Sequence, residues 1–568
     1  MARLSTGLFK SWMRKEASWG VYPTDMDTDS QLIFNTAPGL SLVPTKEEDP
    51  ALLGNIFPAD FVTTNKIVSG SIGFSAHPEG LNTILYHSLG KVKSTGAAPR
   101  GSLCIFYSGA AESCLMHVAN NQLSVFIGAE GAEVLDVNFN LTGIMDFTDL
   151  AFNTIAKCVT AINTYTDYRA FAVGDTASNT GLIADQPAPL HGSATISNTG
   201  ALGAFTGATV PAFAPDDYDI DISIDGGAVE QVAVSLVALD DWDDVALKIQ
   251  TALRALTAKL ETVTITGGKF VVTATSFGPT STVEITAGTA GSAGGDLLAA
   301  ITALSADYTA TIDTPVNGGA YQSKGAAFQS RTVKLDSILG ITSYKHTLTS
   351  MSIGENADSF TYVQSLGLTL AQAFTGLKAG QLTLDMPNGG LITGTVNCIG
   401  KDMADVTPPA VSTFESTKPQ VSGRVQLYIN GQKLGYNAVN LDYNPNLFAE
   451  VEGGSMFQGE AQNGKRVNCS ISPGFHWDDD TKTEIYDRLQ NDERVEAIIV
   501  FESVDEAETL IKYGQFWRFT LCQITESQPD AGGEVFNLPS KLDVLQPTEA
   551  TFRPVEVEVI SDRADLTA

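Results

Sequence analysis

Several features that would place this chain in a common protein class are scarce or missing. No stretch of about 18 apolar residues occurs in the 568 residues, and the basic start, residues 1–20, lacks the apolar core of a secretion signal. We therefore expect synthesis in a cytoplasm, no signal peptide and no membrane-spanning segment. The six cysteines form no CxxC motif, so we expect reduced, buried side chains; they are Cys104, Cys114, Cys158, Cys398, Cys469 and Cys522.

Positive charge is also scarce. The chain has 34 lysine and arginine residues against 65 aspartate and glutamate residues, which gives a formal net charge of −31. Tight binding to nucleic acid needs clustered cations that neutralise phosphates. The composition therefore argues against a conventional DNA-binding protein.

Motifs that mark enzymes are missing as well. The sequence has no GxSxG, Walker A or dinucleotide-binding fingerprint, and its histidines show no HExxH or HxxxH spacing. We expect no enzyme activity, no catalytic residue, no cofactor and no metal site. A glycan hydrolase with two dispersed carboxylates is the third-ranked alternative.

Two local clusters have a chemical interpretation and a structural one. Residues 476–480 (His-Trp-Asp-Asp-Asp) could suggest a metal site, but adjacent residues rarely converge on one ion, so a helix cap is favoured. Phe516, Trp517 and Phe519 flank Arg518 and could stack on bases. In an acidic chain with alternating strand spacing, packing in a hydrophobic core is the favoured interpretation.

The residues that are abundant point to a mainly β protein. The sequence contains 52 glycines and is rich in threonine, serine and valine, which is typical of many short strands joined by turns. Residues 67–74 predict a strand, followed by a helix that begins at Pro78 and ends at Gly90. A second strand–helix unit is predicted from residue 466, with a capping box over 481–484 at the start of the helix.

Two hairpins are predicted by alternating patterns. One joins residues 123–127 to 133–143, and the other joins 382–386 to 391–400. In the first, Leu135, Val137, Phe139 and Leu141 should face a core, while Val134, Asp136, Asn138 and Asn140 face outward. The two hairpins and the two strand–helix units suggest an internal duplication, although the matched units occur in opposite order; unrelated strands of similar composition are the alternative.

The remaining segments divide the chain further. Residues 18–61 are polar and dotted with prolines, which favours an extended arm or long loop. Residues 192–318 are rich in alanine, glycine and threonine, and their strand and helix patterns predict a compact ββαβββ unit. This segment has 15 acidic and 4 basic residues, so we expect an inserted domain on an outer surface. Strands are predicted at 423–429, 439–446, 497–502, 515–524 and 555–560.

Taken together, these elements resemble the tail tube proteins of long-tailed bacteriophages, in the larger type with two β-sandwich tube modules. The resemblance lies in residues 68–74 with 81–90, in 381–403, and in a C-terminal set. That set comprises residues 428–431, 439–446, 467–489 and 536–539. The insert is similar to small domains of phage tail and flagellar proteins, through residues 222–227, 241–256 and 268–272.

The resemblance implies a structural virion protein of mainly β fold with a small α+β insert. Its chains would join edge to edge into rings, preferably trimers with pseudo-sixfold symmetry and alternatively hexamers, and the rings would stack into a tube that conducts viral DNA. Other tail proteins would be partners, residues 18–61 would bridge rings, and the insert could contact the host surface. The implied division is 1–61 (arm), 62–191 and 319–410 (first tube module), 192–318 (insert) and 411–568 (second tube module). A tail-tip adhesin or other virion protein is the second-ranked alternative.

Overall fold

The structure is a computed structural model of the chain. It describes residues 10–37, 39–48, 61–90, 92–111, 113–128, 134–183, 191–198, 216–224, 227–237, 240–257, 261–266, 268–277, 282–289, 295–303, 310–312, 331–338, 342–351, 355, 357–365, 369–410, 416–449, 459–463, 466–530, 536–547 and 553–566. The protein is mainly β, as the composition predicts. No helix in these ranges has the length and apolar character needed to cross a membrane.

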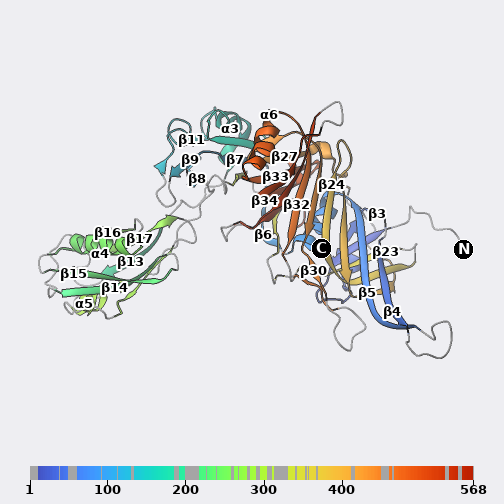
Figure 1. The fold of residues 1–568 in the computed structure, drawn as a ribbon, viewed down its shortest axis with the longest axis horizontal. Coiled ribbons are helices and arrows are strands. Elements are labelled where there is room, and N and C mark those ends of the chain that lie inside the picture. Colours follow the sequence, from blue (N-terminus) through green and yellow to red (C-terminus); the bar gives the residue numbers. More distant parts are fainter. Residues whose placement is uncertain are drawn as a thin grey trace.

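The largest part, which we call the tube body, is built from residues near both ends of the chain (Figure 1). Its first half contains β1 (Ser11–Lys15), α1 (Met26–Asp29), β2 (Gln31–Ile33), β3 (Asn35–Ala37), β4 (Leu40–Glu48), β5 (Phe61–Ser75), α2 (Pro78–Leu89), β6 (Val92–Ala97), β22 (Tyr344–Thr349), β23 (Phe360–Ser365), β24 (Ala371–Met386), β25 (Thr393–Gly400) and β26 (Asp402–Val406). Its second half contains η3 (Ser422–Arg424), β27 (Val425–Ile429), β28 (Gln432–Leu434), β29 (Tyr436–Asn444), β30 (Leu447–Phe448), β31 (Gln462–Asn463), β32 (Asn468–His476), α6 (Asp479–Thr481), η4 (Lys482–Asp487), α7 (Arg488–Gln490), β33 (Arg494–Glu508), β34 (Ile511–Ser527), β35 (Asn537–Val544) and β36 (Val555–Ser561).

Eight strands of the tube body form one continuous antiparallel sheet in the order β4, β5, β25, β24, β29, β32, β35, β34. The middle contact joins the two halves of the chain, because Leu382–Met386 of β24 pair with Val439–Tyr443 of β29. The N-terminal parts of β24 and β34 continue into a second layer, which closes over a shared hydrophobic core.

The two halves of the tube body have the same connectivity. In the first, β1 pairs with β2 and β23, and β24 pairs with β23, β25 and β26. In the second, β27 pairs with β28 and β33, and β34 pairs with β33, β35 and β36. The elements occur in the same order along the chain, with α2 after β5 and the second helix (α6, η4 and α7) after β32. We call these halves the first and second repeat.

Matched registers support this repeat at the level of single residues. The register shift between Ala379 and Gln381 in β24 recurs between Ile524 and Glu526 in β34. The strands before the two helices read SGSIGF (69–74) and SISPGF (470–475). A bulge is a specific local feature, so its recurrence at the equivalent position argues against two unrelated sheets. The duplication suggested by the sequence is therefore present, but in direct order.

The strand–helix units are confirmed, and the two hairpins have different outcomes. The predicted hairpin at 382–400 is formed by β24 and β25. The predicted hairpin at 123–143 lies in a separate small domain, so its match to 382–400 was wrong. Its alternating pattern is also broken: Asp136 is buried and accepts a hydrogen bond from Tyr168, while Val137 and Leu141 are exposed in a turn. Phe139 faces the core as predicted.

This small domain has its own hydrophobic core and sits on the second repeat (Figure 1). It contains β7 (Gly101–Tyr107), β8 (Ser113–Ala119), β9 (Gln122–Gly128), β10 (Val134–Leu135), β11 (Ile144–Asp146), α3 (Ile155–Ile162), β12 (Tyr168–Gly174), η2 (Thr180–Leu182) and β21 (Val333–Ser337). The sequence analysis did not separate it from the first tube module. Its strand patterns resemble those of the tube body, but its strands form separate sheets around a separate core.

A further domain is inserted between η2 and β21 of the small domain. It contains β13 (His191–Asn198), β14 (Asp216–Ile224), β15 (Val229–Leu236), α4 (Trp242–Thr257), β16 (Thr262–Thr266), β17 (Lys269–Phe277), β18 (Val283–Ala287), β19 (Gly295–Asp296), α5 (Leu297–Ala303) and β20 (Ala310–Ile312). The predicted ββαβββ elements are all present. Trp242, Val245, Ile249 and Leu253 of α4 pack on two four-stranded sheets, and the domain lies apart from the tube body in Figure 1.

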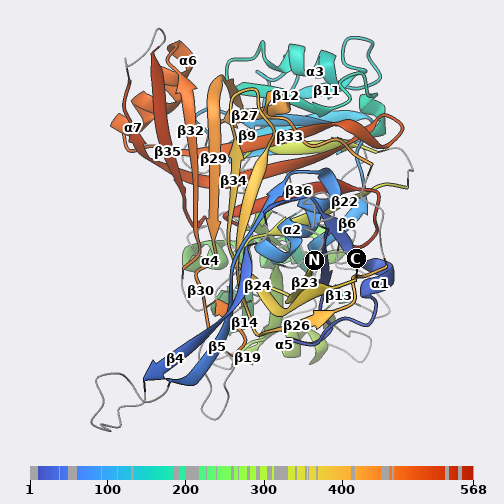
Figure 2. The same ribbon diagram turned by 90° about the vertical axis from the view of Figure 1, so that its right-hand side faces the viewer.

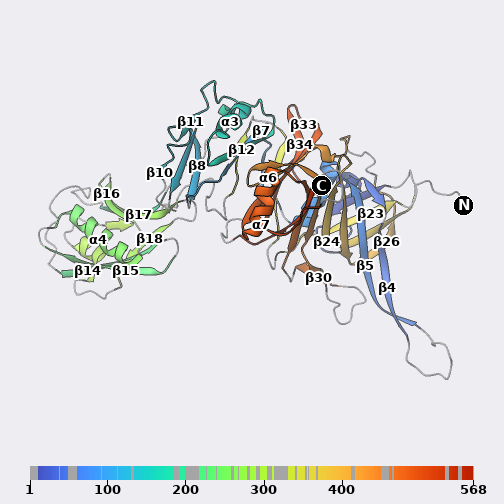
Figure 3. The same cartoon turned by 45° about the horizontal axis from the view of Figure 1, so that its top comes forward.

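The segment at residues 18–61 contains strands of the sheet, where an extended arm or long loop was the expectation. β2, β3 and β4 lie within it, and β4 pairs with β5 over nine registered positions from Leu40 to Glu48. The local pattern is irregular because β4 is a sheet edge whose outer side has no described partner strand. The hairpin of β4 and β5 projects from the body in Figures 2 and 3. Residues 49–60, at its tip, lie outside the described residues.

Candidate assembly surfaces

One face of the eight-stranded sheet is the core face. Leu382, Leu384, Leu441, Ile471 and Leu542 point into it and are almost completely buried. The alternation in burial along β25, β29 and β32 follows the period of two that places successive side chains on opposite faces. The alternate residues of these strands therefore lie on the opposite face of the sheet.

This opposite face, which we call the polar face, carries mostly small hydroxyl and amide side chains. They include Ser69, Ser71, Thr383, Thr393, Thr395, Asn397, Asn440, Ser470, Ser472 and Asn537. Its charged residues include Asp385, Asp442, Glu526, Asp543 and Lys541, together with Lys378, which is buried opposite Ile399 with its Nζ 2.6 Å from Glu460 Oε1. A hollow on this face is lined by Asp442, Ser470, Thr525, Lys541 and Asp543. Charged residues are therefore few on the polar face, and most of them are acidic.

The sheet ends in two strand edges. Among the described strands, β4 pairs only with β5, and the last residues of β34 pair only with β35. Unpaired edges of this kind expose a row of N–H and C=O groups that favour the addition of another strand. The edges lie at opposite ends of the eight-stranded order, so copies of the chain can join β34 of one to β4 of the next.

The two repeats differ in how much their helices are covered. All twelve residues of α2 are buried. Figure 2 shows α2 beside β36 of the second repeat, where Glu79 accepts hydrogen bonds from Ser561 Oγ at 2.9 Å and Asp562 N at 3.2 Å. In the second helix, Asp479, Asp480, Lys482 and Thr483 are exposed. In α2 this face is covered by the neighbouring repeat. The same face of the second helix is exposed.

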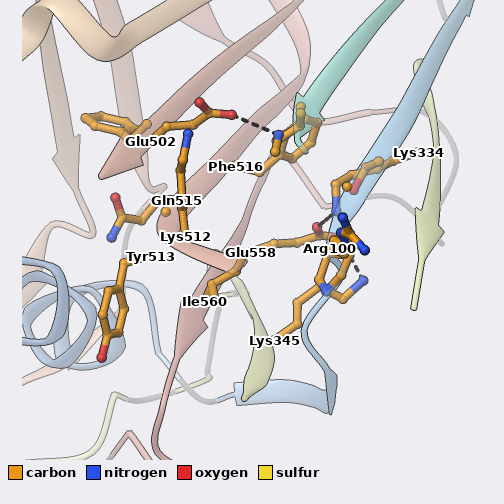
Figure 4. Close-up of a pocket in the computed structure, with 17 residues that line it drawn as sticks. Arg100, Lys334, Lys345, Glu502, Lys512, Tyr513, Gln515, Phe516, Glu558 and Ile560 are labelled. Carbon is orange, nitrogen blue, oxygen red and sulfur yellow. Dashed lines mark hydrogen bonds and ion pairs between the residues drawn. The ribbon is translucent and has the colours of Figure 1, made fainter. Parts of the chain in front are cut away.

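The small domain meets the tube body at a narrow pocket lined by β7, β12 and β21 of the small domain and by β22, β33, β34 and β36 of the tube body (Figure 4). Glu502 accepts a hydrogen bond from Gly174 N at 2.8 Å. Lys334 Nζ lies 2.5 Å from Glu558 Oε2 and 2.8 Å from Asp336 Oδ1, and Lys345 also pairs with Asp336. These lysines are balanced by carboxylates of the same interface, so the arrangement is that of a domain contact.

The same interface contains a fully buried carboxylate. Glu496 accepts hydrogen bonds from Thr332 N and Oγ1 at 2.8 and 2.6 Å, and Arg518 Nε lies 3.6 Å from its other oxygen. Burial raises the pKa of Glu496 and outweighs the opposing effect of Arg518. Lys334 and Lys345 hold the pKa of the buried Asp336 well below its usual range, although burial opposes its ionisation. Charged pairs thus fix the small domain to the second repeat.

The clusters singled out from the sequence have structural roles. Asp478 is the N-cap of α6 and accepts a hydrogen bond from Thr481 N at 2.8 Å, so residues 476–480 form the predicted cap. The capping box is Asp478 with Thr481, and the predicted box at 481–484 was wrong because the helix starts one turn earlier. Trp517 and Phe519 lie in the main core, and Phe516 lies in the small-domain contact. The six cysteines are free and buried, as predicted.

The chain matches the profile of a known protein family. The profile of the phage tail tube protein family matches residues 11–537, which covers the small domain, the insert and the tube body up to the start of β35. No curated protein matches the chain. Because the family match spans nearly the whole chain, and the fold is a β-sheet with two open edges, the chain belongs to the phage tail tube protein family and is a structural protein of the virion tail.

Proposed function

We propose that three chains form one ring of the tail tube, with the six repeats in pseudo-sixfold symmetry. The observation that carries this proposal is the internal seam, in which β24 of the first repeat pairs with β29 of the second. If the same contact recurs between chains, a ring of three contributes 24 strands to one closed barrel, and closure removes the free edges. A hexamer of chains would double the number of repeats.

The polar face lines the lumen in this arrangement. The side with the core faces outward because the helices, the second layer and the small domain all lie on it. Hydroxyl and amide side chains interact with water as readily as with phosphate, and the few excess carboxylates repel DNA weakly. The resulting wall lets viral DNA slide during ejection without binding sites that would hold it.

The predicted domain division is kept for 192–318, an insert on the outer surface, and for 411–568, the second tube module. The first tube module takes β1 to β4 from the predicted arm, and the small domain within 62–191 and 319–410 sits between insert and tube. The projecting hairpin of β4 and β5 lies within reach of an adjacent ring and bridges the stack. Contact of the insert with the host surface rests on its position at the far end of the molecule (Figure 3).

Two measurements test this proposal. Negative-stain electron microscopy of the purified protein at rising concentration should show hollow tubes of constant bore, and native mass spectrometry of released rings should show three chains. Spiky trimers or monomers that never stack would favour a tail-tip adhesin instead. Six chains in a ring would overturn the trimer and leave the tube in place.

A lysine substitution tests the lumen. Thr395→Lys on the polar face should leave tube assembly unchanged and lower infectivity, because a ring of added cations binds phosphates. Thr264→Lys, on the insert, is the matched control and should not lower it.

A further inference from the structure

The strongest unexplained feature of the tube body is the unequal covering of its two helices. Superposing the repeats by their registers makes Ser75 equivalent to His476, since each lies two residues before its helix N-cap. Glu79 is then equivalent to Asp480, and Asn82 to Thr483. Glu79 and Asn82 are buried against β36, with Asn82 Nδ2 donating to Ile560 O at 3.1 Å, whereas Asp480 and Thr483 are exposed.

We infer that a second copy of this chain covers the exposed face of the second helix, and that residues 408–410 of that copy lie against Asp480 and Thr483. This inference rests on the proposed ring and specifies which residues of two chains meet in it. β36 is equivalent to β26, because β36 pairs with β34 as β26 pairs with β24. Ile560 is therefore equivalent to Pro408, and Asp562 is equivalent to Ala410. The segment after β26 thus takes the place of the end of β36.

The same equivalence gives the strand register of the seam between chains. In the internal seam, Leu382 lies opposite Tyr443, and Thr383 lies opposite Asp442. The shared bulge makes Thr383 equivalent to Gln528. Leu40 pairs with Gly70 as Leu441 pairs with Ile471 in the second repeat, so Leu40 is equivalent to Leu441. The next residues, Ser41 and Asp442, are therefore equivalent too. Gln528 of one chain therefore lies opposite Ser41 of the next, and Ser527 lies opposite Leu42.

The seam between chains is weaker than the internal seam, for a reason visible in the residues. Leu384 is equivalent to Pro529, which has no N–H to donate to a neighbouring strand. Ser561, whose hydroxyl donates to Glu79, is equivalent to Pro409. The internal seam is also reinforced by β22, which pairs with β36 across the two repeats. Prolines at an open edge limit unwanted strand pairing, so the chain can remain unassembled until rings form cooperatively.

Carboxyl footprinting of the wild-type protein tests the helix contact without any substitution. A carbodiimide label should modify Asp479 and Asp480 in the unassembled chain and lose most of this reaction in assembled tubes. Asp243 and Asp244, exposed at the start of α4 in the insert, are the matched controls and should stay reactive. Tubes in which Asp479 and Asp480 remain fully reactive would overturn the inference and leave the proposed tube standing.

Paired cysteines test the register. Ser41→Cys with Gln528→Cys should give covalent dimers and trimers when assembled tubes are oxidised, and reduction should return single chains. Thr383→Cys with Asp442→Cys, the equivalent pair of the internal seam, should oxidise within one chain and give no larger species. Oxidised tubes of the first variant that contain only single chains would contradict the register. If that variant does not assemble, the carboxyl footprinting of wild-type tubes decides whether the inference holds. A wild-type protein that forms no tubes would contradict the proposed function itself.

Discussion

At the scale of single residues, the interface between the small domain and the second repeat depends on buried charge. Glu496 has no exposed side-chain surface, and Arg518 is nearly as buried. A buried ion whose partner is removed keeps its desolvation cost and loses its compensation. Loss of Arg518 should therefore reduce the stability of the protein more than neutralisation of Glu496 does.

Arg518→Met should lower the free energy of unfolding by about 3 kcal/mol, because it leaves Glu496 buried without its nearest cation. Glu496→Gln should cost about 1 kcal/mol, since the amide oxygen can still accept hydrogen bonds from Thr332. Chemical denaturation of the unassembled variants measures both. Because the folded-state pKa of Glu496 is raised, the deficit of Arg518→Met should grow as the pH rises through that pKa. Equal costs for the two variants would contradict this assignment.

His87 gives a second prediction at this scale. It is buried in α2 with its ring centroid 4.6 Å from that of Phe360, and burial lowers its pKa from 6.5 to about 4. The unfolded chain therefore binds a proton that the folded chain does not, so the stability contribution of His87 is lost as the pH falls from 6.5 towards 4. His87→Phe should remove up to about 3 kcal/mol of this pH dependence. The comparison is a series of denaturation curves from pH 4 to 7, with His476→Gln as control.

At the scale of elements, the edge strand β4 depends on a close approach of two backbones. Gly70 has a φ of +141°, and a Cβ at this position would lie 2.0 Å from the carbonyl oxygen of Gly39. Only glycine fits such a contact without moving the strand. The edge strand β4 is thus positioned by one residue in the neighbouring strand.

Gly70→Ala should displace β4 from β5 and abolish tube formation, while the pairing of β5 with β25 keeps the core of the body folded. Gly96→Ala on β6 is the matched control, since a Cβ there meets no atom within 4 Å. Electron microscopy reports assembly, and circular dichroism reports folding. Normal tubes from Gly70→Ala would show that β4 is not an assembly edge.

At the scale of the whole molecule, the chain is nested: the insert lies within the small domain, and the small domain lies within the first repeat. Each has a separate hydrophobic core. Domains with their own cores fold and unfold largely as units. The outer domains are therefore separable from the sheet that assembles.

Removing residues 191–312 and joining the ends with a short glycine–serine linker should leave tubes of unchanged bore and lose one unfolding transition in calorimetry. The size of the main transition should be nearly unchanged because the insert shares no core with the tube body. Loss of assembly in this variant, with the rest of the chain folded, would place the insert in the ring contact. Wild-type tubes treated with trypsin should lose the same segment first.

Sequence patterns were enough to predict the local elements and the kind of protein. Alternating strands at 382–400 and 423–446, the helix from Pro78 to Gly90 and the whole order of the insert follow from short-range periodicity and turn chemistry, which a sequence reports directly. The burial of Trp517 and of the cysteines follows from their residue types.

Tertiary structure alone decided which strands pair and which surfaces stay open. The 123–143 segment has the same pattern as a tube strand, yet it belongs to another core, and the burial of Asp136 depends on Tyr168 from a distant strand. The register of β24 on β29, the common bulge and the bare face of the second helix involve residues far apart in the chain. Such contacts are set by packing between distant segments, which local patterns do not encode.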